Sequence, residues 1–357
     1  METLSLRQLT STSARDDRPE LPDASRDAVI EGRPMRAIVQ RAYGGEDTWR
    51  LEDHPIPRPG PDEVLIAVRA AGIDRGTWHL MTGAPYLLRL AFGLLRPKNP
   101  VPGLDVSGTV IAIGAAVTRF RVGDAVFGVS RGSLAEYAVA REDKLARKPP
   151  ELTFEEAAVM GVSALTALAA IDEARVQPGQ RVLVIGASGG VGTYAVQLAR
   201  AMGARVGGVC SAAKADLVTS LGADHVIDHT TADFADGSRT YDAILDIGGV
   251  ASVARLRRAL GPTGTLVIVG GESGSRWSPG LDRQLWSMLL SPFVRQRLTM
   301  AVCVEHFAPL ERLARLAEAG TIRPVVERAY PLSEAPLAMR HLAEGNARGK
   351  LAIRVDG

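Results

Sequence analysis

A glycine-rich stretch in the middle of the chain, IGASGGVGTYAVQLAR over residues 185–200, combines residue types and spacing that suit the binding of phosphate groups. A glycine-rich turn between a buried strand and a helix lets the backbone approach a pyrophosphate, and the helix N-terminus supplies N–H donors. The alternative, a helix entry without a ligand, is disfavoured by the alternating strands and helices around it. We predict dinucleotide contacts from Gly186, Ser188, Gly189, Gly190, Val191 and Gly192.

The residues about 20 positions further on select between NAD and NADP. An NAD site places an Asp or Glu there to bind the ribose hydroxyls. Residues 207–216, GGVCSAAKAD, have no acid before Asp216 and offer the hydroxyl of Ser211 and the ammonium of Lys214 instead. This pattern suits the extra phosphate of NADP(H). The alternative is that Lys214 is a solvated lysine in the first turn of a helix.

Residues 74–86, DRGTWHLMTGAPY, contain the polar and aromatic side chains best suited to contact a substrate. Asp74, Thr77, Trp78 and Tyr86 are the candidates for catalytic contacts. Each has a structural alternative: Asp74 as a helix cap or salt-bridged carboxylate, and the two aromatic residues as parts of the core. His79 is interpreted as a surface or structural histidine. The sequence shows no Ser-Lys-Tyr group that could relay a proton.

Two patterns of predicted secondary structure must position these residues. From residue 35 to about 150 short strands alternate with turns, which favours an antiparallel or barrel-like part. After an alanine-rich helical stretch near residue 155, strands alternate with helices, as in a doubly wound parallel sheet. Helices are expected to end at Gly222 and Gly261. Strands are expected over 181–186, 204–210, 224–228, 241–249, 264–271 and 298–304.

Composition narrows the function classes. The chain has 357 residues and a formal net charge of +2, without the basic stripe of a nucleic-acid-binding protein. No apolar run reaches the roughly 18 residues that span a bilayer. Residues 1–34 lack the apolar core of a signal peptide and are expected to be a disordered tail. Cys210 and Cys303 are interpreted as buried free thiols, which favours a cytoplasmic location.

Four motifs in order resemble the zinc-independent medium-chain dehydrogenase/reductases, within the quinone-oxidoreductase-like group. They are VPGLDVSGTVIAIGAAVTRFRVGDAVFG, GASGGVGTYAVQLARAMGA, SLGADHVIDH and EGNARGKLAIRV. The resemblance covers about residue 36 to the C-terminus. It implies a GroES-like catalytic domain over 35–155, completed by 321–357, and a Rossmann NADP-binding domain over 156–320. Local pattern alone leaves open whether the last stretch extends the parallel sheet or rejoins the first domain. The resemblance also implies a cofactor cleft between the domains and a homodimer.

The chain departs from the zinc-containing members of this superfamily at their ligand positions. These positions are occupied here by Asp74, Leu104, Asp105 and Val162, and a four-cysteine lobe is absent after residue 130. Leucine and valine cannot bind zinc, and two cysteines cannot build the structural site. The resemblance therefore implies an enzyme without zinc, in which Asp74 faces the cleft.

These observations predict a metal-free, NADPH-dependent oxidoreductase that delivers hydride to quinones or α,β-unsaturated carbonyl compounds, which delocalise the added charge themselves. Two alternatives remain open: a general NADP-dependent alcohol or carbonyl oxidoreductase, and an NADPH-binding scaffold without catalysis. Further cofactor contacts are expected from Thr166, Gly248, Gly270 and Lys350.

Overall fold

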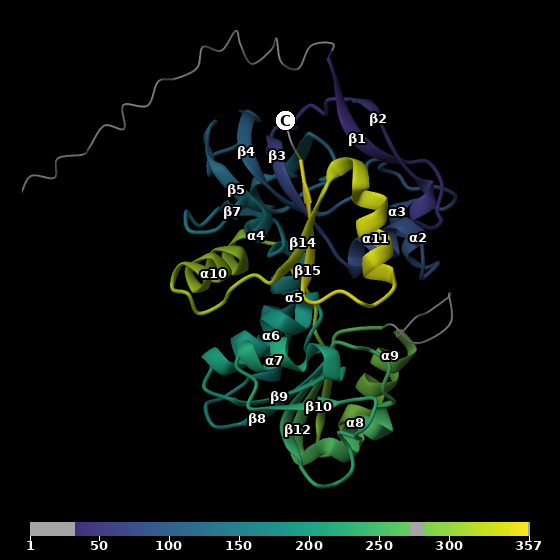
Figure 1. Ribbon diagram of the computed structural model, residues 1–357, viewed down its shortest axis with the longest axis vertical. Helices are drawn as coiled ribbons and strands as arrows, with labels where there is room; N and C mark the ends of the chain where they lie inside the picture. The colour runs from purple at the N-terminus through teal and green to yellow at the C-terminus, as the bar shows by residue number, and fades with distance from the viewer. Residues whose placement is uncertain (1–32, 272–280, 356–357) are drawn as a thin grey trace, which may run out of the picture.

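The computed structural model describes residues 33–271 and 281–355. The tail predicted over residues 1–34 therefore lies almost entirely outside the described residues. Figure 1 shows two parts stacked along the long axis, a β-rich part above and a parallel sheet with helices below. Within the described ranges, no helix is long and apolar enough to cross a membrane.

The lower part contains a six-stranded parallel sheet in the order β10-β9-β8-β11-β12-β13. This order confirms the predicted doubly wound sheet. The winding reverses between β8 and β11, where such sheets bind ligands at the carboxyl ends of their strands. The strands are β8 (Arg181–Ile185), β9 (Arg205–Cys210), β10 (His225–Asp228), β11 (Tyr241–Asp246), β12 (Leu260–Ile268) and β13 (Arg297–Met300).

Apolar periodicity explains how the helices attach to this sheet. The strand β8 is buried along nearly its whole length, and the helix that follows it packs Ala195, Leu198 and Ala199 into the same core. The helices of this part are α5 (Gly161–Ala174), α6 (Gly190–Ala201), α7 (Ala215–Ser220), α8 (Val253–Ala259), α9 (Leu281–Leu290) and α10 (Phe307–Glu318), with the 3-10 turns η3 (Ala212–Lys214) and η4 (Ser291–Phe293).

The upper part is built on a seven-stranded sheet in the order β14-β15-β3-β4-β5-β7, with β6 also paired to β3, and a two-stranded sheet of β1 and β2. Its strands are β1 (Pro34–Gln40), β2 (Trp49–Pro55), β3 (Glu63–Ile73), β4 (Asp105–Ile113), β5 (Ala125–Val129), β6 (Tyr137–Arg141), β7 (Leu145–Arg147), β14 (Val326–Pro331) and β15 (Lys350–Arg354). Its helices are α2 (Arg75–Thr82), α3 (Leu88–Phe92), α4 (Phe154–Ala158) and α11 (Ala335–Ala343), with η1 (Glu46–Thr48), η2 (Glu142–Lys144) and η5 (Leu332–Glu334).

The C-terminal stretch rejoins the upper part. Strand β15 pairs antiparallel with β3, with Leu351 opposite Ile73, and β14 pairs with β15. Figure 1 shows the yellow C-terminal strands beside the purple and blue strands of the upper part. This pairing decides between the two placements that local pattern left open, and it carries Lys350 to the junction of the two parts.

Several element boundaries differ from the sequence expectation. Strand β11 ends at Asp246 rather than at residue 249, and β12 covers Leu260–Ile268 rather than 264–271. The alanine-rich stretch forms two helices, α4 and α5, because the backbone bends at Val159 and lets the carboxylate of Asp105 accept the N–H of Val162 at the start of α5. Gly261 does not end a helix: α8 stops at Ala259, and the buried, extended Leu260 already begins β12. The last strand of the parallel sheet ends at Met300 rather than at residue 304. Gly222 does follow α7, with φ +103°.

Candidate cofactor and substrate site

The turn between β8 and α6 forms a cradle in which side chains have no room. Gly186 has φ +83°, a conformation that favours glycine, and a Cβ at Gly192 would lie 2.1 Å from the carbonyl oxygen of Gly186. Gly189 is the N-cap of α6 and has an extended conformation. As at the start of any α-helix, the first N–H groups of α6 have no intrahelical acceptor. A turn of this shape could accept the pyrophosphate of a dinucleotide. The contacts predicted for Gly186, Ser188, Gly189, Gly190, Val191 and Gly192 stay a prediction.

Two further predicted glycines lie at the carboxyl ends of neighbouring strands. Gly248 follows β11, and a Cβ on Gly186 would lie 2.9 Å from its nitrogen. Gly270 follows β12, and a Cβ there would lie 2.0 Å from the carbonyl oxygen of Ile247. The backbones of three neighbouring strand ends therefore pack against one another without intervening side chains.

The end of β9 has the features that the sequence predicts for the adenosine end of the cofactor. Cys210 is the last residue of the strand and is buried, and the next residue, Ser211, is partly exposed. The ammonium of Lys214 donates hydrogen bonds to the carbonyl oxygens of Gly345 and Ala347, at 3.0 and 2.9 Å. Burial lowers the pKa of Lys214. One of its three N–H donors is left for a further partner.

Three charged groups near this strand end were not among the predicted site residues. The guanidinium of Arg348 binds both carboxylate oxygens of Asp216, at 2.8 and 2.7 Å, and also contacts the carbonyl oxygen of Ala213. This contact lowers the pKa of Asp216. Asp228 ends β10 opposite Cys210 and binds Thr230. The sequence offered one signal for these groups: Arg348 is a cation two residues before the predicted cofactor contact Lys350, in the stretch NARGK.

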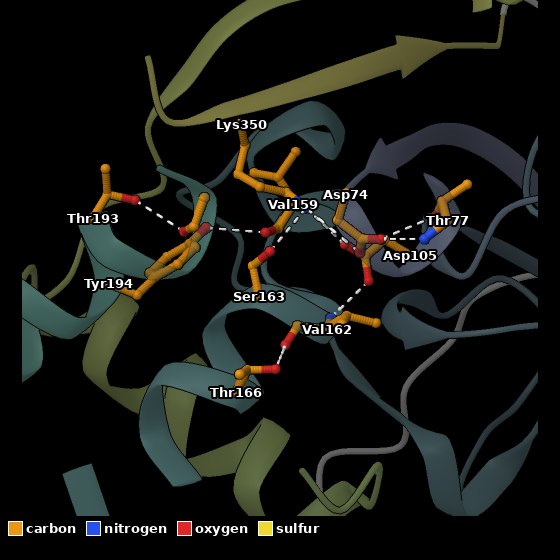
Figure 2. Close-up of polar contacts among 11 residues, drawn as sticks. Asp74, Thr77, Asp105, Val159, Val162, Ser163, Thr166, Thr193, Tyr194 and Lys350 are labelled. Carbon is orange, nitrogen blue, oxygen red and sulfur yellow. Dashed lines mark hydrogen bonds and ion pairs between the residues drawn. The ribbon is translucent and has the colours of Figure 1, made fainter. Parts of the chain in front are cut away.

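A buried ion cluster lies where the two parts of the molecule meet (Figure 2). The ammonium of Lys350 lies 3.2 Å from Oδ2 of Asp105, 3.0 Å from Oγ of Ser163 and 3.8 Å from Oδ2 of Asp74. All four side chains are at most 7% exposed. The other oxygen of Asp105 accepts the N–H of Val162 at 2.6 Å. The cluster therefore joins strand ends of the upper part to helix α5 of the lower part.

Burial shifts the charge state of this cluster. It raises the pKa of Asp105 to about 7, and the adjacent Lys350 only partly opposes the shift, while the carboxylate of Asp74 adds to it. In Asp74, Oδ1 accepts the backbone N–H and the hydroxyl of Thr77, and Oδ2 has no hydrogen-bond partner. Near neutral pH the carboxyl group of Asp105 can therefore gain or lose a proton.

The residues of this cluster do not fit a zinc ion. The sequence resemblance implied that Asp74, Leu104, Asp105 and Val162 replace the zinc ligands of other family members. In the structure, the carboxylates of Asp74 and Asp105 lie 3.8 and 3.2 Å from the ammonium of Lys350. A cation already occupies the space between them, and the other two side chains offer no ligand atom. Across the described ranges, no group of three or more His, Cys, Asp or Glu side chains could hold a metal ion.

The predicted catalytic residues fall into two groups. Asp74 and Thr77 are buried and bind each other, so Asp74 caps α2, as its structural alternative proposed. Trp78 and Tyr86 instead line a cavity of about 450 Å³, together with Tyr43 and Arg89. The guanidinium of Arg89 stacks between the rings of Tyr43 and Tyr86, 4.4 and 4.6 Å from their centroids. The sequence reasoning missed Tyr43 and Arg89.

Thr166, a predicted cofactor contact, lies on α5 one turn after Val162. Its hydroxyl donates to the carbonyl oxygen of Val162 at 2.7 Å (Figure 2). The thiol of Cys303 also contacts Thr166. Burial raises the pKa of Cys303 and of Cys210. Both thiols are free, as predicted, but Cys303 is only half-buried.

A second buried ion pair lies at the carboxyl edge of the parallel sheet. Asp246, the last residue of β11, is fully buried and pairs with the guanidinium of Arg283 in α9. Burial raises the pKa of Asp246, and Arg283 opposes that shift. Arg283 also donates to the carbonyl oxygen of Gly249. The pair fixes α9 next to the strand ends that carry the glycine cradle.

A parallel doubly wound sheet with a glycine cradle, joined to a GroES-like β-rich part, defines a class of nicotinamide-dependent oxidoreductases. Family models agree: an alcohol dehydrogenase GroES-like domain matches residues 60–150, and a zinc-binding dehydrogenase domain matches residues 221–353. The chain belongs to the medium-chain dehydrogenase/reductase family, in its quinone-oxidoreductase-like group.

Two relatives and one solved structure illustrate this membership. The chain is 31% identical to the quinone-oxidoreductase homolog, chloroplastic, of Spinacia oleracea, over 89% of this chain and 98% of the relative. It is 32% identical to the quinone oxidoreductase of Sus scrofa, over 89% and 97%. The structure of the quinone oxidoreductase from Coxiella burnetii superposes with a TM-score of 0.81 at 28% identity, over 90% of this chain and all of that one.

Proposed function

We propose that this oxidoreductase is NADPH-dependent and metal-free, and that it delivers hydride to quinones or α,β-unsaturated carbonyl compounds. The observation that carries the proposal is the ammonium of Lys350, which lies 3.8 Å from Asp74 and 3.2 Å from Asp105, two residues that the sequence resemblance assigns to zinc-ligand positions of other family members. Alcohol oxidation in those members needs a Lewis acid to stabilise an alkoxide. Quinones and enones delocalise the added negative charge without one.

The chain supplies binding and orientation. The cradle from Gly186 to Gly192 would hold the pyrophosphate, and Ser211 with Lys214 would hold the ribose phosphate. When bound, the reduced nicotinamide supplies a hydride to the acceptor. The cavity beside Trp78 and Tyr86 gives the acceptor two aromatic walls, and their N–H and O–H groups are donors suited to a carbonyl oxygen.

A screen of acceptors tests the proposed activity. The protein, treated with a chelator, is mixed with NADPH and with quinones, enones, aldehydes or ketones in turn, and oxidation is followed by absorbance. We expect turnover of quinones or enones, unchanged by the chelator. Turnover should be slower in Tyr86→Phe, which removes the hydroxyl proposed to bind the carbonyl oxygen of the acceptor. Turnover of simple alcohols with NADP, or activity lost with a bound metal, would overturn the proposal.

Cofactor preference gives a quantitative prediction for Lys214. We expect Lys214→Ala to weaken NADPH binding by about ten- to a hundredfold, since a hydrogen bond to a charged group contributes roughly 1.5 to 3 kcal/mol and about 1.4 kcal/mol is tenfold in affinity. NADH binding should hardly change, because NADH lacks the phosphate. Ser211→Asp should discriminate further against NADPH by like-charge repulsion. Titration of both cofactors measures these changes.

Lys148 provides a matched control for this prediction. Its ammonium also donates to two backbone carbonyl oxygens, those of Pro149 and Leu152, and burial also lowers its pKa. Lys148→Ala should leave the affinities for both cofactors unchanged. Equal losses for NADPH and NADH in Lys214→Ala, or a wild type that favours NADH, would contradict the assignment.

A further inference from the structure

Residues 87–98 present an unusual number of apolar side chains to solvent. Leu90 is 72% exposed and Leu95 is 86% exposed, although both are large hydrophobic residues. The exposed set comprises Leu87, Leu90, Phe92, Leu94 and Leu95, from α3 and the turn after it. Figure 1 shows α3 beside α2 at the edge of the upper part. Exposed apolar groups gathered in one segment indicate a surface that binds a partner or a membrane.

The charge of this region has one sign. No Asp or Glu occurs from residue 75 to residue 104, whereas four cations do: Arg75, Arg89, Arg96 and Lys98. Arg96 and Lys98 directly follow the exposed leucines and are themselves exposed. Within the described part of the chain, no ion pair or hydrogen bond is recorded for either side chain. Exposed apolar side chains with Arg96 and Lys98 beside them suit a partner that has both an apolar region and negative charge.

The segment is held in place beside the proposed substrate cavity. The hydroxyl of Tyr43 donates to the carbonyl oxygen of Gly93 at 2.6 Å. The backbone N–H of Lys98 donates to the carbonyl oxygen of Phe92 at 2.8 Å. Arg89 donates to the carbonyl oxygen of Gly83 at 2.9 Å and lines the cavity. The exposed side chains therefore stand on an anchored base, next to the cavity lined by Tyr86 and Arg89.

We propose that residues 87–98 dock this protein on an anionic lipid bilayer. The exposed leucines and Phe92 would enter the boundary between headgroups and acyl chains, and Arg96 with Lys98 would meet anionic headgroups. A second copy fits less well, because a two-fold contact of this segment with itself would bring its cations together without any nearby acid. The segment is also short compared with the roughly 20 to 30 residues that each side of a stable protein interface uses.

Vesicle sedimentation tests this proposal without cofactor or substrate, so the result does not depend on the proposed function. The full chain is mixed with phosphatidylcholine vesicles, with or without phosphatidylglycerol, at low and high salt. We expect binding to the anionic vesicles that weakens with salt. Arg96→Gln/Lys98→Gln should weaken that binding by at least about tenfold, since each cation near an anionic surface contributes roughly 1 kcal/mol.

The leucines have a matched control on another helix. Leu94→Ser/Leu95→Ser should lose at least about tenfold in vesicle binding. Leu285→Ser/Leu289→Ser removes two similarly exposed leucines from α9 and should retain it. The circular dichroism spectrum and the melting temperature of both variants should match those of wild type, which shows that they fold.

Three results would overturn the docking proposal. The first is a wild type that binds neither kind of vesicle. The second is an equal loss of binding in the variants of residues 94–95 and of α9. The third is a self-associated wild type that becomes monomeric with Leu94→Ser/Leu95→Ser, measured by light scattering, because the segment would then bind a second copy.

Discussion

Lys350→Met should lower the free energy of unfolding by about 3–5 kcal/mol, the usual cost of removing one partner from a buried ion pair. Methionine keeps the length of the side chain but leaves Asp105 and Asp74 without the cation between them. Both carboxylates are almost completely buried, so water cannot take its place. Urea unfolding followed by circular dichroism measures the loss as a lower midpoint.

The loss should depend on pH with a defined sign. The pKa of Asp105 is already raised by burial to about 7, and removing the ammonium raises it further. A carboxyl group with a raised folded pKa binds its proton more tightly in the folded state, so stability falls as pH rises through the window between the unfolded and folded values. The deficit of Lys350→Met should therefore grow as the pH rises above about 7, where Asp105 has lost its proton in the wild type but keeps it in the variant. If Lys350→Met only removed packing contacts, the loss of unfolding free energy would not change with pH.

Two variants separate charge from packing in this cluster. Lys350→Met/Asp105→Asn removes both charges while an amide oxygen can still accept the N–H of Val162, so it should recover part of the lost stability. Lys144→Met breaks an ion pair with Glu305 that is partly exposed, and should cost no more than about 1 kcal/mol. Equal losses in Lys350→Met and Lys144→Met would show that the buried cluster does not stabilise the fold.

The sequence predicted what is local in this fold and missed what comes together from far apart. Continuous apolar runs such as residues 181–186 are local patterns, and that strand formed as predicted, over Arg181–Ile185. Gly222 acts through its own backbone conformation and was also predictable. The role of Gly261 was not predictable. The helix already ends at Ala259, because the buried side chain of Leu260 belongs to the strand that follows.

The ion cluster shows why the site itself was only partly predicted. Asp74 lies between the end of β3 and the start of α2, Asp105 begins β4, and Lys350 begins β15, the last strand of the chain. They meet only because β15 pairs with β3, a choice that no local pattern contains. The same long-range pairing brings Arg348 to Asp216. Residue types predicted the chemistry of these positions, and topology determined which of them meet.

Gly192→Val should lower the affinity for the dinucleotide by on the order of a hundredfold, about 2.7 kcal/mol. A Cβ at this position would lie 2.1 Å from the carbonyl oxygen of Gly186 and 2.8 Å from the backbone of Ala187, and backbone atoms cannot yield as a flexible side chain can. Helix α6 must therefore move away from β8, which takes its N–H donors off the pyrophosphate. Fluorescence titration with NADPH measures the affinity.

Gly189→Ala separates the loss of the ligand site from the loss of packing. A Cβ at Gly189 would meet only the carbonyl oxygen of Gly186, at 3.5 Å, and its backbone is already extended, so stability should change by less than about 0.5 kcal/mol. The new methyl group would nevertheless stand in the cradle and should weaken NADPH binding at least about tenfold. Wild-type affinity in both variants, with each shown to be folded, would mean that the cofactor phosphates bind elsewhere. A loss confined to Gly192→Val would assign the effect to helix packing, because only that substitution displaces the helix.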